Sequence, residues 1–403
     1  MQLREFIHAG SFTILVAGFL YFFVSTMVWL MIGALAPLIA QEFSLSASER
    51  GLMIAVPILA GALVRLPLGI AADSFGAKRT ALAGIAATIV PLIAGWLFGR
   101  TLAEVYLIGI LLGVAGGSFA VAFPLVSRSY SPHYQGLAMG IVGAGYLGAA
   151  VAKFSGPRLA EWVGWHGTLG LAIVPVVMVL FLFLLLPEPR TDTLPAKTLW
   201  QYLRVLKTRD AWWFNLFYMT SFGGFVGLAT FLPLFFNDQY GLSPISAGNL
   251  AAGCIAVASL VRPLGGWLAD QVGGMKMLFA LFAALGVLSF GLVQLPPLDW
   301  FVFMVFTLMA LLGMANGAVF QLVPQRFSQE IGVVTGIVGA TGALGGFFLP
   351  ASLGLSKDLS GSYGAGFALF GMVCCLCVAL AAYAQKNWNH CTIVVPGSTN
   401  AND

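Results

Sequence analysis

The stretch VRLPLGIAADSFGAK at residues 64–78 decides the fold, because a related stretch, VRPLGGWLADQVGGM, occupies residues 261–275. A shift of 197 residues aligns their arginine, glycine and aspartate positions: Arg65 with Arg262, Gly69 with Gly266, Asp73 with Asp270, and Gly76 with Gly273. Two shorter matches have nearly the same offset, GIVGA at 140–144 and 336–340 and LLG at 111–113 and 311–313. Three matches at nearly one offset predict two homologous halves.

The composition places both halves in a membrane. Of 403 residues, 59% are hydrophobic and only 8% are charged, whereas a soluble domain carries about 25% charged residues. A spanning helix needs about 20 apolar residues. Hydropathy gives twelve such runs, at 12–40, 50–72, 80–98, 103–125, 136–160, 167–187, 211–236, 244–268, 276–295, 300–323, 332–355 and 364–385.

The long polar break at 188–210 divides these runs six and six. The chain is therefore predicted to be an all-α membrane protein with twelve transmembrane helices in two homologous six-helix halves. The predicted parts are an N-terminal half at 1–187, a linker at 188–210, a C-terminal half at 211–385 and a tail at 386–403. We expect it to lie in the inner (plasma) membrane.

The basic residues predict the orientation. With both termini and the linker in the cytoplasm, the inner loops hold Arg4, Lys78, Arg79, Arg128, Arg190, Lys197, Arg204, Lys207, Arg209, Lys276, Arg326 and Lys386. The outer loops then hold Arg50, Arg100, Arg158 and Lys357. This excess of inner basic residues follows the positive-inside rule. The net charge of +4 is explained by topology, so we predict no nucleic-acid partner.

The repeated stretches end in a loop motif, GIAADSFGAKR at 69–79 and GGWLADQVGGMK at 265–276. A helix N-terminus favours a nearby anion, so each aspartate is expected to act as a charged latch between helices. The predicted gating positions are Gly69, Asp73, Gly76, Lys78, Arg79, Gly266, Asp270 and Gly273.

Arg65 and Arg262 are charges inside spans. Each precedes the aspartate of its motif by eight residues, or about 12 Å of helix, which is near the middle of a hydrocarbon core about 30 Å thick. All fifteen acidic residues fall in or beside predicted loops. A buried arginine pair without carboxylates predicts an anion site, since guanidinium donors match planar oxyanions. The alternative is that each arginine bonds backbone carbonyls or snorkels to the membrane surface.

Lys153, in AAVAKFSGP, is a third charge inside a predicted span. A buried lysine can lose its proton, whereas arginine cannot in practice. Lys153 is therefore a candidate for proton coupling or a second anion contact. The alternative is that it snorkels toward the periplasm, because Pro157 and Glu161 follow within two turns.

The residues above resemble the nitrate/nitrite porter family of the major facilitator superfamily, over essentially the whole chain. The glycine-rich runs GLAMGIVGAGYLG (136–148) and GIVGATGALGGFFLP (336–350) are similar to its paired nitrate motifs, and Arg65 and Arg262 match its arginine pair. The resemblance implies a major facilitator fold, a monomer, and an anion held between the halves. It adds as substrate-binding residues Tyr218, Phe222, Phe119, Phe23, Gly143, Tyr146 and Gly339. Tyr146 departs from the family, which often has asparagine there, so the shape of the pocket is expected to differ.

Three functions follow as hypotheses. The first is a nitrate or nitrite transporter working by alternating access, through exchange or proton symport, with the anion and protons as partners. The second is transport of another small anion, such as cyanate or a short carboxylate. The third is a nutrient sensor, which the short tails and linker disfavour. No catalytic constellation, metal cluster or phosphate loop stands out, so we predict no enzyme activity, metal or cofactor.

Overall fold

The computed structural model describes residues 5–6, 9–131, 134–186, 209–326 and 331–388. Most of the predicted linker and tail therefore lie outside the described residues. Within the described ranges the secondary structure is helical, apart from one isolated bridge between Gly10 and Tyr130.

The helices before the linker follow one another with short connections. They are α2 (Phe12–Trp29), α3 (Met31–Glu42), α4 (Ala47–Phe75), α5 (Ala77–Leu97), α6 (Leu102–Gly116), α7 (Phe119–Ser127), α8 (Gln135–Gly143), the 3₁₀ turn η1 (Ala144–Tyr146), α9 (Leu147–Leu171) and α10 (Ile173–Leu185). Three predicted runs are thus interrupted: 12–40 at Leu30, 103–125 at Gly117–Ser118, and 136–160 at η1.

The helices after the linker are longer and less interrupted. They are α12 (Arg209–Tyr240), α13 (Pro244–Val272), α14 (Gly274–Leu292), α15 (Leu298–Arg326), α16 (Ile331–Ser360) and α17 (Gly364–Trp388). Each coincides with one predicted apolar run.

The described residues contain eleven helices long and apolar enough to cross a membrane. The one at Ala138–Leu185 has 48 residues and covers two predicted spans. Gly164 lies inside it with φ 71° and ψ 172°, which is not a helical conformation. A straight helix of that length would extend about 72 Å, more than twice the hydrocarbon thickness.

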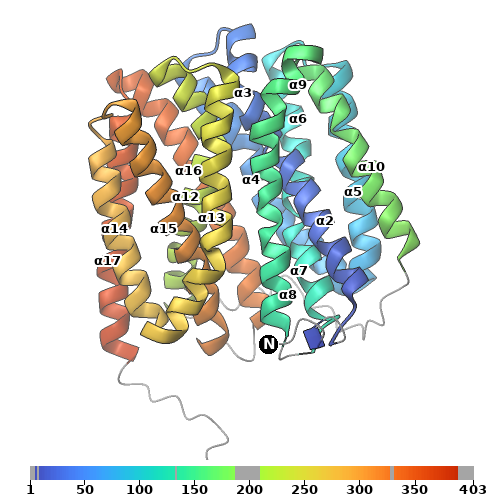
Figure 1. Cartoon of the computed structure of the whole chain (residues 1–403), viewed down its shortest axis with the longest axis vertical. Helices are drawn as coiled ribbons and strands as arrows, with labels where there is room; N and C mark the ends of the chain where they lie inside the picture. The colour runs from blue at the N-terminus through green and yellow to red at the C-terminus, as the bar shows by residue number, and fades with distance from the viewer. Residues whose placement is uncertain (1–4, 7–8, 132–133, 187–208, 327–330, 389–403) are drawn as a thin grey trace, which may run out of the picture.

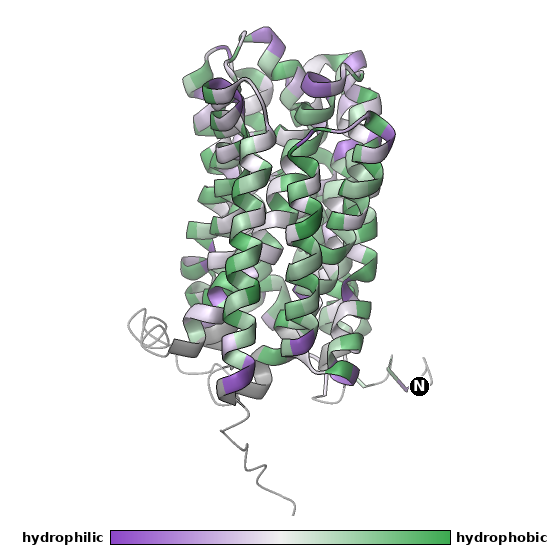
Figure 2. Ribbon diagram, turned by 90° about the vertical axis from the view of Figure 1, so that its left-hand side faces the viewer, coloured by the Kyte–Doolittle hydropathy of each residue, from purple (hydrophilic) through white to green (hydrophobic). Residues whose placement is uncertain are grey.

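The surface has an apolar belt between two polar ends (Figure 2). We call the end holding the start of α2 and the end of α17, at the bottom of Figure 1, the near end, and the opposite end the far end. Exposed tryptophans occur toward both ends: Trp96, Trp162 and Trp300 toward the far end, and Trp212 and Trp267 toward the near end. Tryptophan is enriched at membrane interfaces, so these side chains support a position across a bilayer.

Helices from the two parts of the chain meet along the middle of the molecule. In Figure 1, α12–α17 fill the left side and α5–α10 the right, with α3 and α4 between them. We call α2–α10 the N-terminal bundle and α12–α17 the C-terminal bundle. The main contacts between them pair α4 with α16, α9 with α13, and α3 with α12. The candidate site lies along this interface.

The glycine-rich runs let helices pack closely within each bundle. A Cβ at Gly148 would clash with the carbonyl of Phe23 on α2, and one at Gly345 would clash with the carbonyl of Met219 on α12. These two glycines place α9 against α2 and α16 against α12, and so position the aromatic residues of the site.

Candidate anion-binding site

The two repeated arginines occupy equivalent positions in their helices. Arg65 lies 18 residues after Ala47, the first residue of α4, and Arg262 lies 18 residues after Pro244, the first residue of α13. Their surroundings differ, since Arg65 is 3% exposed whereas Arg262 is only partly buried.

Arg65 spans the interface between the bundles. Its Nε donates to the carbonyl of Gly116 at 3.2 Å, and its Nη1 donates to the carbonyl of Gly339 on α16. Its Nη2 has no hydrogen-bond partner among the described residues. One donor of a buried cation is therefore uncommitted.

Aromatic rings surround the Arg65 guanidinium. Its Cζ lies 5.5 Å from the ring of Trp29, 5.2 Å from Phe119 and 5.3 Å from Phe222. Such contacts are worth about 0.5–1 kcal/mol at exposed sites and about 2 kcal/mol or more when the cation is desolvated. The rings keep water away and leave the charge without a carboxylate among its described contacts.

Arg262 is oriented by Tyr218. Its Nη2 donates to the Tyr218 hydroxyl at 2.9 Å, and its Cζ lies 5.7 Å from the ring of Tyr146. Tyr218 stacks on Phe222 with ring centroids 4.9 Å apart and an interplanar angle of 6°. Because Phe222 also faces Arg65, this stacked pair lies between the two arginines.

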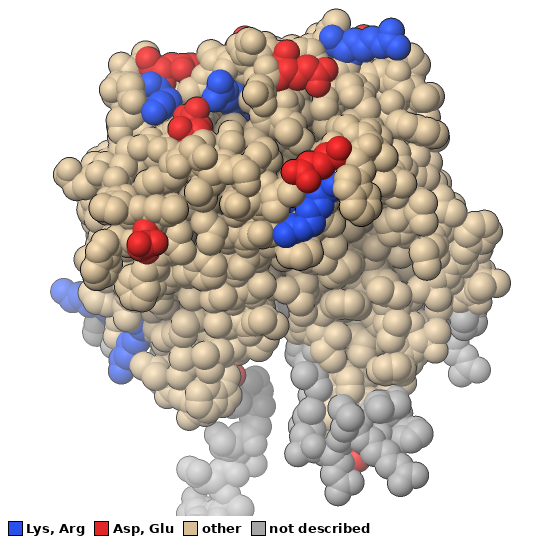
Figure 3. All heavy atoms as spheres, turned by 45° about the horizontal axis from the view of Figure 1, so that its top comes forward, with Lys and Arg blue, Asp and Glu red and all other residues tan. Residues whose placement is uncertain are grey.

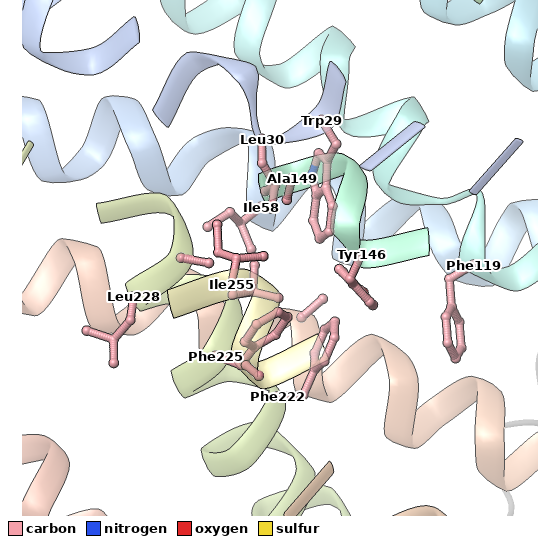
Figure 4. Close-up of a cluster of buried hydrophobic side chains, with 14 of the residues drawn as sticks. Trp29, Leu30, Ile58, Phe119, Tyr146, Ala149, Phe222, Phe225, Leu228 and Ile255 are labelled. Carbon is pink, nitrogen blue, oxygen red and sulfur yellow. The ribbon is translucent and has the colours of Figure 1, made fainter. Parts of the chain in front are cut away.

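Tyr146 projects from η1 toward Arg65, Arg262 and Phe222. Its ring packs edge-on against Phe22 at 5.0 Å and against Phe222 and Phe225 at 5.5 Å each, as Figure 4 shows for the labelled rings of Tyr146, Phe222 and Phe225. Its hydroxyl lies within hydrogen-bonding reach of the Arg65 side chain and also interacts electrostatically with Arg262, although the contact with Arg65 does not have the geometry of a full hydrogen bond. The interface thus holds a second unused donor.

The predicted aromatic residues are brought together with one exception. Phe119 packs on Phe123 and faces Arg65. Phe23 contacts Phe19, whereas its neighbour Phe22 makes the ring contacts with Phe119, Phe123 and Tyr146. Successive residues on a helix point about 100° apart, so the adjacent phenylalanine faces the site.

The two predicted glycines differ in their distance from the charge. A Cβ at Gly339 would lie 3.2 Å from Phe119 and 4.0 Å from Nη1 of Arg65. A Cβ at Gly143 would meet only Phe123, at 3.8 Å. Gly339 therefore borders Arg65, while Gly143 contacts only the ring of Phe123.

Lys153 lies outside the arginine and aromatic cluster. It is fully buried, and its Nζ donates to the carbonyl of Leu30 at 2.5 Å. That carbonyl belongs to the junction between α2 and α3. Gly248 on α13 packs against the Lys153 backbone, so this lysine lies in the contact between the bundles on the far-end side of the arginines.

Two residues of the first loop motif make polar contacts with other helices. Asp73 pairs with Arg128, at the end of α7, and Lys78 donates to the carbonyl of Leu186. Gly76 and Gly273 end their helices with φ 92° and 96°, values that favour glycine. The Cβ positions of Gly69 and Gly266 approach α7 and α15. Asp270 has no ion pair among the described residues.

At the far end, polar contacts join the bundles. Asp358 of α16 accepts from the backbone N–H groups of Ala47 and Ser48 at 3.1 and 2.8 Å, and so caps α4. Arg50 pairs with Asp238 at 2.9 Å, and Tyr363 donates to the same carboxylate at 2.7 Å. Figure 3 shows the charged side chains gathered on this end.

The helix backbones at the far end also approach closely. A Cβ at Gly51 would lie 2.6 Å from the carbonyl of Pro350 and 3.2 Å from Cα of Gly354. The described structure is therefore closed at the far end, between α4 and α16.

Sequence reasoning missed Trp29, Phe22 and the far-end contacts. Trp29 donates from Nε1 to the carbonyl of Pro57 and lies beside Arg65. A tryptophan in the middle of an apolar run was an available signal, because its N–H needs a partner when buried. Arg50 and Asp238 are 188 residues apart, and no local pattern links them.

Comparisons with known proteins agree with this architecture. The family model of the Major Facilitator Superfamily matches residues 17–350. The "Nitrite extrusion protein" of Bacillus subtilis (strain 168) is 33% identical over 375 residues, covering 93% of this chain and 91% of that protein. The "Probable nitrate/nitrite transporter NarK2" of Mycobacterium tuberculosis (strain ATCC 25618 / H37Rv) is 34% identical over 89% of this chain and 93% of its own.

A third relative, the "Probable nitrate/nitrite antiporter NarK1" of Thermus thermophilus, is 33% identical over 83% of this chain and 82% of its own. The predicted resemblance is thereby confirmed, as is the prediction that the chain is not an enzyme. The chain belongs to the nitrate/nitrite porter family of the Major Facilitator Superfamily, a family of multi-pass membrane transporters.

Proposed function

We propose that the protein transports nitrate and nitrite across the inner (plasma) membrane by alternating access, holding the anion between Arg65 and Arg262. The observation that carries the proposal is the uncommitted Nη2 of buried Arg65, which is surrounded by rings and has no carboxylate among its described contacts. The names of the relatives support nitrate and nitrite as the anions.

The chemistry of the site suits a small planar oxyanion. A membrane-embedded arginine costs about 3 kcal/mol or more when uncompensated, and an anion offsets that cost. Hydrogen bonds to charged groups contribute about 1.5–3 kcal/mol each. Tyr146 can add its hydroxyl, while Tyr218 orients Arg262. The rings of Phe119 and Phe222 flank the Arg65 guanidinium, an arrangement that favours a small ion.

The predicted twelve spans and two homologous halves form part of the proposal. The break at Gly164 supports reading Ala138–Leu185 as two spans. The matched positions of Arg65 and Arg262 in their helices support an internal repeat. Symmetric halves with a site between them are the arrangement typical of these transporters.

Alternating access requires that the far-end contacts open. In the described structure the caps and ion pairs between α4, α12 and α16 hold that end closed. We infer that the far end faces the periplasm, with both termini in the cytoplasm, in accordance with the distribution of basic residues. The protein is proposed to work as a monomer, with residues 1–187 and 211–385 as its moving halves.

The coupling mode is exchange of nitrate for nitrite or symport with protons. Lys153 is the candidate for proton coupling, because it is a buried titratable group in the contact that must open. If exchange alone operates, its bond to the Leu30 carbonyl makes it a structural residue.

The experiment is uptake of labelled nitrate into proteoliposomes, with a pH gradient, with nitrite trapped inside, or with neither. Uptake driven by trapped nitrite identifies an exchanger, and uptake driven by the pH gradient identifies a symporter. Failure of both contradicts nitrate transport. In that case uptake of labelled cyanate or of a labelled short carboxylate identifies the anion that the arginine pair binds.

A further inference from the structure

One face of α12 continues past the aromatic residues of the site. Asn215, Tyr218 and Phe222 are spaced three and four residues apart and therefore share a helix face. Because α12 ends at the far end, where Asp238 meets Arg50, Asn215 lies one turn from Tyr218 toward the near end. Its amide is thus the next polar group on this face of α12, on the near-end side of Arg65 and Arg262, which together form the arginine layer.

Asn215 is also tied to the helix that holds Arg65. Its Oδ1 accepts from the hydroxyl of Thr341 on α16 at 2.8 Å. Thr341 lies two residues after Gly339, whose carbonyl accepts from Arg65, and next to Gly342, whose Cβ position meets the ring of Tyr218. The Asn215–Thr341 pair therefore adjoins both arginine contacts.

The amide of Asn215 is incompletely paired. The residue is 5% exposed, and its Nδ2 has no hydrogen-bond partner among the described residues. The Thr341 hydroxyl also lies 3.1 Å from the carbonyls of Ile337 and Val338, yet it has one proton to donate. Buried polar groups are nearly always paired. In either orientation of the amide at least one N–H bond of Asn215 stays unused beside the two arginines, and this needs an explanation.

We propose that Asn215 forms a transfer subsite, where its amide N–H bonds hold the oxyanion between the arginine layer and the near end. A neutral donor binds an anion more weakly than a guanidinium does. Weak binding suits an ion in transit, because conduction requires that the ion can also leave. The inference rests on the proposed anion transport and adds a second, weaker anion-binding site to it.

The test compares two variants in nitrite-loaded proteoliposomes. Asn215→Leu removes the donors at similar volume, and we expect the maximal rate of nitrate exchange to fall at least tenfold, while the nitrate Kd of the purified protein changes less than threefold. Asn215→Asp is expected to lose exchange at neutral pH and to regain part of it at acid pH, where a protonated carboxyl can again donate. Because protonation also removes a buried charge, the recovery supports the subsite only together with the loss of rate at nearly unchanged nitrate Kd in Asn215→Leu.

Thr220→Val is the matched control, because Thr220 is a buried polar residue of α12 that contacts Cys377 on α17. It should keep wild-type exchange, and the melting temperatures of all three variants should lie close together. Wild-type exchange rates in Asn215→Leu, or an Asn215→Asp variant equally inactive at every pH, would overturn the subsite. Wild-type protein that moves no nitrate would instead refute the proposed function.

Discussion

Arg65 on α4 donates from Nη1 to the backbone carbonyl of Gly339 on α16, so a charge of the N-terminal bundle is held by the main chain of the C-terminal bundle. An anion that binds Arg65 must fit beside this contact or replace it. Substrate binding and the relation between the bundles are therefore linked through one guanidinium.

Arg65→Lys tests the need for the planar donor fork. Lysine keeps the charge but cannot donate to Gly116 and Gly339 and still offer a further donor in the same plane. We expect the nitrate affinity to fall about 10- to 100-fold, equivalent to roughly 1.4–2.8 kcal/mol. Equilibrium binding to purified protein measures this. Arg100→Lys, at an exposed position in the far-end turn between α5 and α6, is the control, and equal affinities in both variants would count against a fork geometry.

Tyr218→Phe tests the orientation of Arg262. The substitution keeps the ring that stacks on Phe222 but removes the hydroxyl that accepts from Arg262. Loss of one hydrogen bond to a charged group is expected to weaken nitrate binding about tenfold. Tyr21→Phe, a buried tyrosine that packs on Phe183, should leave binding unchanged. If the Tyr218→Phe protein bound nitrate with wild-type affinity, the Tyr218 hydroxyl would have no part in anion binding.

Asp238→Asn tests the far-end closure. The amide keeps the shape but loses the charge that pairs with Arg50. Because the pair is partly exposed, we expect about a two- to fivefold shift toward the open far end, from an interaction of roughly 0.5–1 kcal/mol.

The readout is labelling of an Ile58→Cys variant by an impermeant thiol reagent applied at the far end, in a cysteine-free background. Ile58 is buried against Gly346 on α16. Labelling should rise in Asp238→Asn and stay constant in Asp299→Asn, and the difference should shrink at high salt. Unchanged labelling in Asp238→Asn would show that this ion pair does not hold the gate.

Lys153→Gln separates proton coupling from a structural role. The amide can still donate to the Leu30 carbonyl but carries no proton to release. We expect uptake driven by a pH gradient to disappear while exchange of nitrate for nitrite continues. If both transport modes decline together, Lys153 supports the α2–α3 junction and does not couple protons.

The sequence singles out the arginine pair because the internal repeat marks both positions and depth follows from helix rise; their role in anion binding stays a prediction. It could not orient helix α2, because apolar residues are spread around the whole helix, and therefore Phe23 was expected where Phe22 lies. The break at Leu30 lacks a local proline, since Pro37 is seven residues later. The roles of Asn215 and Asp358 depend on residues more than 120 positions away, beyond the reach of any local pattern.

The most direct measurement is calorimetric titration of nitrate into the purified protein and into its Arg65→Leu and Arg262→Leu variants. We predict saturable binding of one nitrate per wild-type chain, displaced by nitrite, and no measurable binding in either variant that still melts like the wild type. Wild-type protein that binds no nitrate, or variants that bind it as well as the wild type does, would contradict an anion held between Arg65 and Arg262.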